Sequence, residues 1–157
     1  MVALLTIGTF DLFHAGHVEL LASCAAIADH VTVGINTDSF VSSYKGTPPI
    51  LTLAERTAVV SSCCYVDYIV ANDGQDAKPT ISAWLSYPSA PAYYTEDTTF
   101  LLAVGKDWKD KDYLAQLQVT EDFLRQNNIT LVYIHTTNEL HSTEIKRRCT
   151  RPVSPLH

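Results

Sequence analysis

Short apolar runs alternate along the chain with segments in which apolar residues recur every three or four positions. The runs are continuous and bounded by polar residues, which is typical of strands buried on both faces of a parallel sheet. The predicted strands are Val2–Ile7, Val31–Ile35, Tyr65–Val70, Phe100–Val104 and Thr130–Ile134.

The segments between these strands predict helices. Thr52 with Glu55 three residues later predicts a capping box, and Pro79 suits the first position of a helix. Asn36–Ser39 offers capping residues for a short helix over Phe40 and Val41, whereas the prolines and glycine of Ser42–Pro49 predict a loop. The predicted longer helices are His17–Ala28, Leu53–Cys63, Pro79–Leu85, Tyr113–Asn127 and Ser142–Cys149.

This alternation predicts an α/β fold, a Rossmann-like, doubly wound, mostly parallel five-stranded sheet with helices on both faces. We expect one domain over residues 1–157, with an irregular insertion at about 87–97. Ligands bind such sheets at the carboxyl ends of the strands. The segments that follow strands and are expected to meet there are Gly8–His17, Asn36–Asp38, Gly105–Lys111 and His135–Lys146.

Composition narrows the function classes. The net charge of −6 argues against nonspecific binding to nucleic acid. No apolar run is long enough to span a membrane, and the first residues lack the pattern of a signal peptide, so we expect a cytoplasmic protein without a membrane partner. The four cysteines form neither a disulfide framework nor a zinc set.

Basic residues concentrate in two runs, at positions 106–111 and 146–151, and none precedes Lys45. Such a distribution suits either a small polyanion or solvated helix ends.

The segment Gly8–His17 carries the most specific chemistry. A strand, a tight turn and a helix start leave unpaired backbone N–H groups, which suit a phosphate. His14 and His17 lie three apart, so they face one way. Such a pair serves as metal ligands, as acid–base catalysts or as donors to a charged transition state. No HExxH pattern or cysteine partner supports a metal site.

This segment resembles the HxGH signature of the cytidylyltransferase-type nucleotidylyltransferases. Several others are similar to segments of bacterial glycerol-3-phosphate cytidylyltransferases, in the same order and over nearly the whole chain. They are Ile35–Asp38 with Phe40, Lys45–Pro49 with Glu55–Arg56, Tyr65–Asp67, Val104–Leu114 and Leu140–Lys146.

The resemblance implies transfer of a cytidylyl group from CTP to a small phosphorylated alcohol, such as glycerol 3-phosphate, with release of pyrophosphate. It implies Mg²⁺ bound with the nucleotide, no protein metal site, and a homodimer. The implied catalytic residues are His14, His17 and Lys45. The implied nucleotide-binding residues are Gly8, Thr9, Phe10, Gly16, Asp107, Ser142, Thr143 and Lys146. The implied substrate-binding residues are Asp11, Asp38 and Arg56. For Asp11, bracing of the turn is an alternative with equal support to substrate binding. For Asp38, the equally supported alternative is capping of a helix.

Four positions depart from the family pattern. Thr136 and Cys64 stand where the pattern has arginines, Glu139 stands where it has a glycine, and His141 stands where the last signature has its first serine. Loss of two phosphate-directed cations leaves two alternatives open: an adenylyltransferase of the same fold, and a nucleotide-binding protein with impaired catalysis. Both histidines and Lys45 are retained, which favours an enzyme.

Overall fold

The computed structural model describes residues 1–74, 76–86 and 94–150. Its five strands form one parallel sheet in the order β3-β2-β1-β4-β5, which confirms the predicted doubly wound fold. The strands are β1 (Val2–Gly8), β2 (His30–Asn36), β3 (Tyr68–Asn72), β4 (Thr99–Gly105) and β5 (Ile129–Ile134). The sheet grows outward from β1 in both directions, so strand order reverses between β1 and β4.

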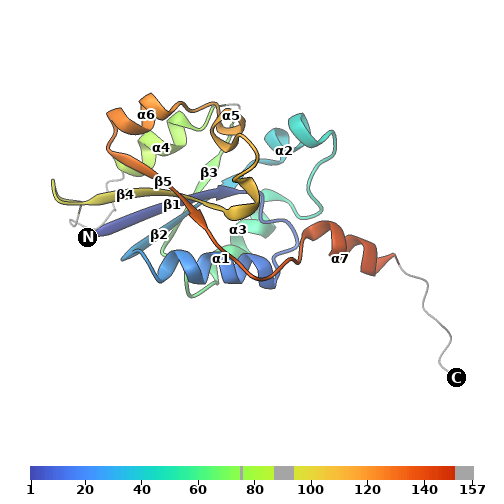
Figure 1. Ribbon diagram of the computed structural model, residues 1–157. Helices are drawn as coiled ribbons and strands as arrows, with labels where there is room; N and C mark the ends of the chain where they lie inside the picture. The colour runs from blue at the N-terminus through green and yellow to red at the C-terminus, as the bar shows by residue number, and fades with distance from the viewer. Residues whose placement is uncertain (75, 87–93, 151–157) are drawn as a thin grey trace, which may run out of the picture.

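Helices cover both faces of the sheet (Figure 1). One face carries α1 (Ala15–Ala25) and α3 (Leu53–Ser61), and the other carries α4 (Lys78–Leu85), α5 (Tyr113–Leu117) and α6 (Glu121–Gln126). Beyond the carboxyl ends of the strands lie α2 (Asp38–Lys45), the 3₁₀ turn η1 (Lys106–Trp108) and α7 (Ser142–Cys149).

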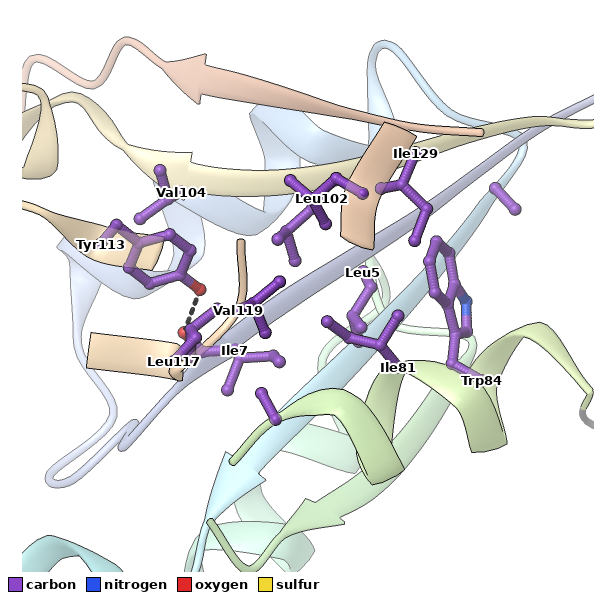
Figure 2. Close-up of a cluster of buried hydrophobic side chains, with 13 residues drawn as sticks. Leu5, Ile7, Ile81, Trp84, Leu102, Val104, Tyr113, Leu117, Val119 and Ile129 are labelled. Carbon is purple, nitrogen blue, oxygen red and sulfur yellow. Dashed lines mark hydrogen bonds between the residues drawn. The ribbon is translucent and has the colours of Figure 1, made fainter. Parts of the chain in front are cut away.

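Each face has its own core because buried strand residues alternate in direction. Figure 2 shows the α4–α5 side, where Leu5 and Leu102 of the sheet meet Ile81 and Trp84. The Tyr113 hydroxyl donates to the Ile7 carbonyl oxygen at 3.1 Å, and burial raises the pKa of this tyrosine. The hydrogen bond ties α5 to the carboxyl end of β1.

The opposite core contains Leu21 and Cys24 of α1 against Val33 and Ile35 of β2. Burial raises the pKa of Cys24 to about 12, as expected for an inert buried thiol. Within the described residues, no helix has the length and apolar character needed to cross a membrane.

Several predicted boundaries are wrong, among them the end of α1, which lies at Ala25 instead of Ala28. β3 begins at Tyr68 instead of Tyr65, because Cys63–Val66 closes a turn after α3. The predicted loop from Ser42 is helical to Lys45, where Gly46 ends α2 with φ of 74°. The predicted helix Tyr113–Asn127 is two helices, because Gln118 adopts a left-handed conformation with φ of 50°. Thr120 then caps α6 through its side chain.

Positions 87–93 of the predicted insertion and Arg151 of the second basic run lie outside the described residues. Tyr94 packs edge-on against Phe100 with ring centroids 5.2 Å apart.

Candidate active site

A cavity of about 470 Å³ lies at the carboxyl ends of β1 and β4, where the strand order reverses. Its walls come from the β1–α1 turn, the end of α2, the η1 region and the residues on both sides of the α7 start. Ligands of doubly wound sheets bind at this place. Eleven of the fourteen residues that the sequence assigns to the site line the cavity. They are Gly8, Thr9, Phe10, Asp11, His14, Gly16, His17, Lys45, Asp107, Ser142 and Thr143.

The β1–α1 turn has an uncommon backbone. Phe10 and Leu12 have φ of 53° and 50°, in the left-handed region that side chains other than glycine's rarely adopt. A Cβ on Gly8 would lie 3.0 Å from the Phe10 ring, so the ring packs directly over the Gly8 backbone. Strain of this kind is held by surrounding structure and is concentrated at functional sites.

The two histidines form the capping box of α1. The Gly16 amide donates to Nδ1 of His14 at 3.1 Å, and the His14 amide donates to Nδ1 of His17 at 3.3 Å. Their rings stack with centroids 3.7 Å apart. Because each Nδ1 accepts a hydrogen bond, the neutral tautomer of each ring carries its proton on Nε2.

Both histidines are held neutral. Burial is the largest cause that lowers the pKa of His17 to about 3; the neighbouring His14 and His141 act in the same direction, and Asp11 opposes them. Burial also lowers the pKa of His14, with His141 as the second cause. At pH 7 the pair therefore offers two neutral Nε2–H donors to a ligand in the cavity.

Asp11 braces the turn. Its carboxylate accepts from the amides of Ile50 and Leu51 at 2.9 and 3.0 Å, and Lys146 lies 3.5 Å away. Burial alone would raise the pKa of Asp11, but the two amides and Lys146 together lower it. The side chain is nearly buried and its oxygens are used within the protein, so the geometry favours the bracing alternative.

Arg56 is fully buried and lies behind the cavity wall. Its guanidinium donates to the carbonyl oxygens of Leu51 and Thr9 at 3.0 and 2.6 Å and to a carboxylate oxygen of Asp38 at 2.5 Å. Asp38 also accepts from the Leu53 amide at 3.2 Å. Neither Arg56 nor Asp38 lines the cavity, so the structure does not bring these two predicted residues to a substrate. The sequence cannot show this, because an arginine three places into a helix gives no sign of its burial.

The start of α7 lies against the β1–α1 turn that carries the histidines. Ser142 donates from its hydroxyl to the Asp11 carbonyl oxygen at 2.6 Å, which fixes the helix start against the turn. The amides of Glu144 and Ile145 bond to the His141 carbonyl, while those of Ser142 and Thr143 are the first of the helix and lie in the cavity wall. This end of a helix suits an anion. Lys146 is not a lining residue and instead pairs with Asp11.

Lys45 lines the cavity from the last turn of α2, beside Tyr44. The Tyr44 hydroxyl lies 3.0 Å from the Thr9 hydroxyl, which links α2 to the turn. Asp107 and Trp108 line the opposite side from η1. Gly105 permits the carboxylate of Asp107 to fold back, because a Cβ there would lie 2.6 Å from its oxygen.

Two residues have roles that the sequence does not assign to them, although Asn36 belongs to a segment that is expected at this edge. Asn36 ends β2 in the cavity wall, and its side-chain oxygen accepts from Asn72, whose own oxygen accepts from Thr80. Its position at the end of a central parallel strand is a usable signal. Glu19 of α1 accepts three hydrogen bonds from Thr137 and Asn138. An ordinary helix glutamate carries no such signal in the sequence.

Among the described residues, no group of three or more histidine, cysteine, aspartate or glutamate side chains is arranged to hold a metal ion. The donors of the site are amides, imidazoles and a lysine. These groups suit the oxygens of a polyphosphate better than a cation.

Comparisons of the sequence with known proteins agree on one family. The family model described as "Cytidylyltransferase-like" matches residues 5–148. The ethanolamine-phosphate cytidylyltransferase of Arabidopsis thaliana is 47% identical over 64 residues, which are 40% of this chain and 15% of that protein. The bifunctional protein HldE of Acidiphilium cryptum is 37% identical over 114 residues, which are 71% of this chain and 24% of that protein. The chain thus spans a quarter or less of either relative.

Among solved structures, the lipopolysaccharide core biosynthesis protein of Thermoplasma volcanium matches with a TM-score of 0.63 and 22% identity. The match covers 87% of this chain and 97% of that one. This similarity concerns the fold.

Proposed function

The chain belongs to the cytidylyltransferase-like family, and we propose that it transfers a cytidylyl group from CTP to a small phosphorylated alcohol. A phosphate oxygen of the acceptor attacks the α-phosphorus of CTP, the bond from this phosphorus to the bridging oxygen breaks, and pyrophosphate leaves with the electron pair. The reaction needs no covalent intermediate on the protein. Positioning and stabilisation of charge supply the catalysis.

The observation that carries this proposal is the neutral histidine pair, which lines the same cavity as the start of α7. His14 and His17 each keep an Nε2–H donor beside the cavity. Donors of this kind stabilise the negative charge that develops on phosphoryl oxygens. Lys45 adds a positive charge from one side, and the amides of Ser142 and Thr143 bind the departing phosphates from the other.

Mg²⁺ supplies charge neutralisation when it is bound with the triphosphate. Because no described cluster of side chains suits a metal ion, we assign the ion's oxygen ligands chiefly to the nucleotide. We assign Gly8, Thr9 and Phe10 to the turn that supports the nucleotide. The resemblance assigns Asp107 to the nucleotide, and its place in the cavity wall supports this assignment.

Our proposal gives Asp38 and Arg56 a supporting role. Their ion pair holds the Thr9 carbonyl and the start of α3, and thereby keeps the turn in place. The family resemblance also supports a homodimer and a cytoplasmic location as parts of the proposal. Sedimentation of the purified protein tests the dimer.

Pyrophosphate release with MgCTP and a panel of phosphorylated alcohols tests the activity. Glycerol 3-phosphate, phosphoethanolamine and a sugar phosphate are suitable members, since relatives include an ethanolamine-phosphate enzyme. Parallel assays with MgATP test the adenylyltransferase alternative. Binding of CTP without turnover on any acceptor would favour a nucleotide-binding protein.

His14→Asn provides the matched variant for this assay. Asparagine is as good a cap as any residue, so its side-chain oxygen retains the bond from the Gly16 amide while the Nε2–H donor is lost. Loss of one such donor lowers kcat about 10²–10³-fold. We expect this loss with little change in the free energy of unfolding. Unchanged turnover would remove His14 from the mechanism.

A further inference from the structure

The segment between β5 and α7, residues 135–141, forms one wall of the cavity, and we call it the strap. Four of its residues line the cavity: Thr136, Asn138, Leu140 and His141. It is irregular in conformation, so its backbone groups have no ladder or helix to hold them. Its shape therefore depends on contacts with neighbouring elements.

Glu19 supplies the principal contacts. One carboxylate oxygen accepts from the amide and the hydroxyl of Thr137 at 2.7 and 2.8 Å, and the other accepts from the Asn138 amide at 2.7 Å. These three short bonds lower the pKa of Glu19, the Thr137 amide being the largest cause. Hydrogen bonds to a charged acceptor are stronger than neutral ones.

The rest of the strap is fixed against the same helix. The side-chain oxygen of Asn138 accepts from the Leu140 amide at 2.8 Å. The Leu140 carbonyl then lies so close to α1 that a Cβ on Gly16 would be only 2.8 Å from its oxygen. Glu19 and Gly16 thus hold the strap at two points, one helical turn apart, on the helix that begins with the histidine pair.

We propose that Glu19 is a positioning residue for the nucleotide, acting through the strap that it holds. This inference rests on the proposed function. Glu19 does not itself line the cavity. Its carboxylate fixes Thr137 and Asn138, and these set where Leu140, His141 and the first amides of α7 meet the phosphates.

The contacts between Glu19 and the strap matter because the strap forms one wall of the cavity. The family pattern places an arginine at Thr136, and this chain lacks that cation. Phosphate binding here depends on amides and on His141, which are effective only in a fixed geometry. We therefore expect the anchor at Glu19 to affect binding of CTP more than the chemical step.

Glu19→Gln tests the proposal. Glutamine keeps an acceptor for Thr137 but turns an N–H donor toward the Asn138 amide. We expect the Kd and KM for CTP to rise roughly tenfold, the effect of losing one charge-assisted bond, with kcat changed less than about twofold. Amide hydrogen exchange at Thr137 and Asn138 should accelerate. Thr137→Val, which removes only the hydroxyl donor, should give the same changes to a smaller extent.

Glu121→Gln is the matched control. Glu121 lies on α6 with 81% of its side chain exposed, so the same change of charge should leave Kd, KM and strap exchange unaltered. Faster exchange in Glu19→Gln with an unchanged Kd for CTP would overturn the proposal, as would a weaker Kd with unchanged exchange.

The same titrations separate this proposal from the proposed function. If the parent protein binds CTP but releases no pyrophosphate, the transferase proposal fails, and the Kd values still decide the role of Glu19. If the parent protein does not bind CTP, both are overturned.

Discussion

Arg56 is a fully buried cation, and each of its three side-chain nitrogens donates to an acceptor within the protein. Its three acceptors, the Leu51 and Thr9 carbonyls and the Asp38 carboxylate, come from three different segments. A planar guanidinium carries five donors on three nitrogens, so it can bridge acceptors that lie too far apart for the single nitrogen of an ammonium. Asp38 keeps 42% of its side chain exposed, so water shares in its solvation and the pair is not isolated in an apolar core.

Arg56→Met should therefore destabilise the fold. The methionine fills the space but leaves the partly buried Leu51 and Thr9 carbonyls without the Arg56 donors, and we expect the free energy of unfolding to fall by about 2–4 kcal/mol. Urea denaturation measures this free energy. Arg125→Met is the control, because 73% of the Arg125 side chain is exposed. Native stability combined with a raised KM for the acceptor would instead support the substrate contact that the sequence suggests.

His17 gives the stability of the protein a dependence on pH. Its pKa is about 3 in the folded state against the ordinary value of 6.5. Between these values the unfolded chain binds more protons than the folded one, so stability falls as the pH drops below 6.5 and is constant above it. Between pH 7.5 and 5, His17 should account for a loss of about 1.5–2 kcal/mol.

His17→Gln isolates this contribution. Glutamine is a standard third residue of a capping box, so the bond from the His14 amide can be kept while the titrating ring is removed. Urea denaturation at several values between pH 5 and 7.5 should show a shallower slope than in the parent protein. The pKa of Asp11 is lowered in the folded protein, so this carboxylate titrates below the pH range of the experiment. Equal slopes would show that His17 is not buried in its neutral form.

Local sequence signals predict the elements of this fold wherever one element's own residues determine it. The Thr52–Glu55 capping box marks the start of α3 correctly, and the apolar runs locate all five strands. The end of α2 is predicted wrongly although Gly46 signals it. Glycine readily adopts the left-handed backbone conformation that commonly ends a helix, and Gly46 does so here. The break at Gln118 had none, because a glutamine in the left-handed region is held there by packing around α5. Likewise, which polar residues reach the cavity depends on contacts between elements.

Gly16 illustrates such a contact at the scale of an element. In a helix, glycine to alanine normally stabilises by up to about 1 kcal/mol. Here the added Cβ would lie 2.8 Å from the Leu140 carbonyl oxygen and 3.1 Å from the His14 ring. Gly16→Ala should therefore destabilise by about 1–3 kcal/mol and accelerate amide exchange in the strap.

Ala15→Gly, one position earlier and exposed, is the control for this variant. It should cost about 1 kcal/mol or less, as ordinary helix propensity requires. Thermal and urea unfolding compare the two. A stabilised Gly16→Ala protein would mean that the strap can move away from α1 without loss.

At the scale of the whole molecule, the topology brings the site together. β1 and β4 are neighbours in the sheet but 90 residues apart in the chain, and segments that follow four different strands contribute to the cavity together with the end of α2. The sequence predicts this convergence from the alternation of strands and helices alone. It does not predict which cations stay free, because Lys146 and Arg56 are paired by residues distant in the chain.

Ligand binding at this edge should stabilise the entire fold, since the cavity unites segments from both halves of the chain. MgCTP at 100 times its Kd adds about 2.7 kcal/mol to the free energy of unfolding. For a domain of this size that corresponds to a rise in Tm of about 5–10 °C. Because the described residues hold no cluster that suits a metal ion, Mg²⁺ alone should leave Tm unchanged, and CTP with EDTA should give a smaller rise than MgCTP. An equal rise with MgATP would favour the adenylyltransferase alternative, and a rise with Mg²⁺ alone would reveal a metal site in the protein itself.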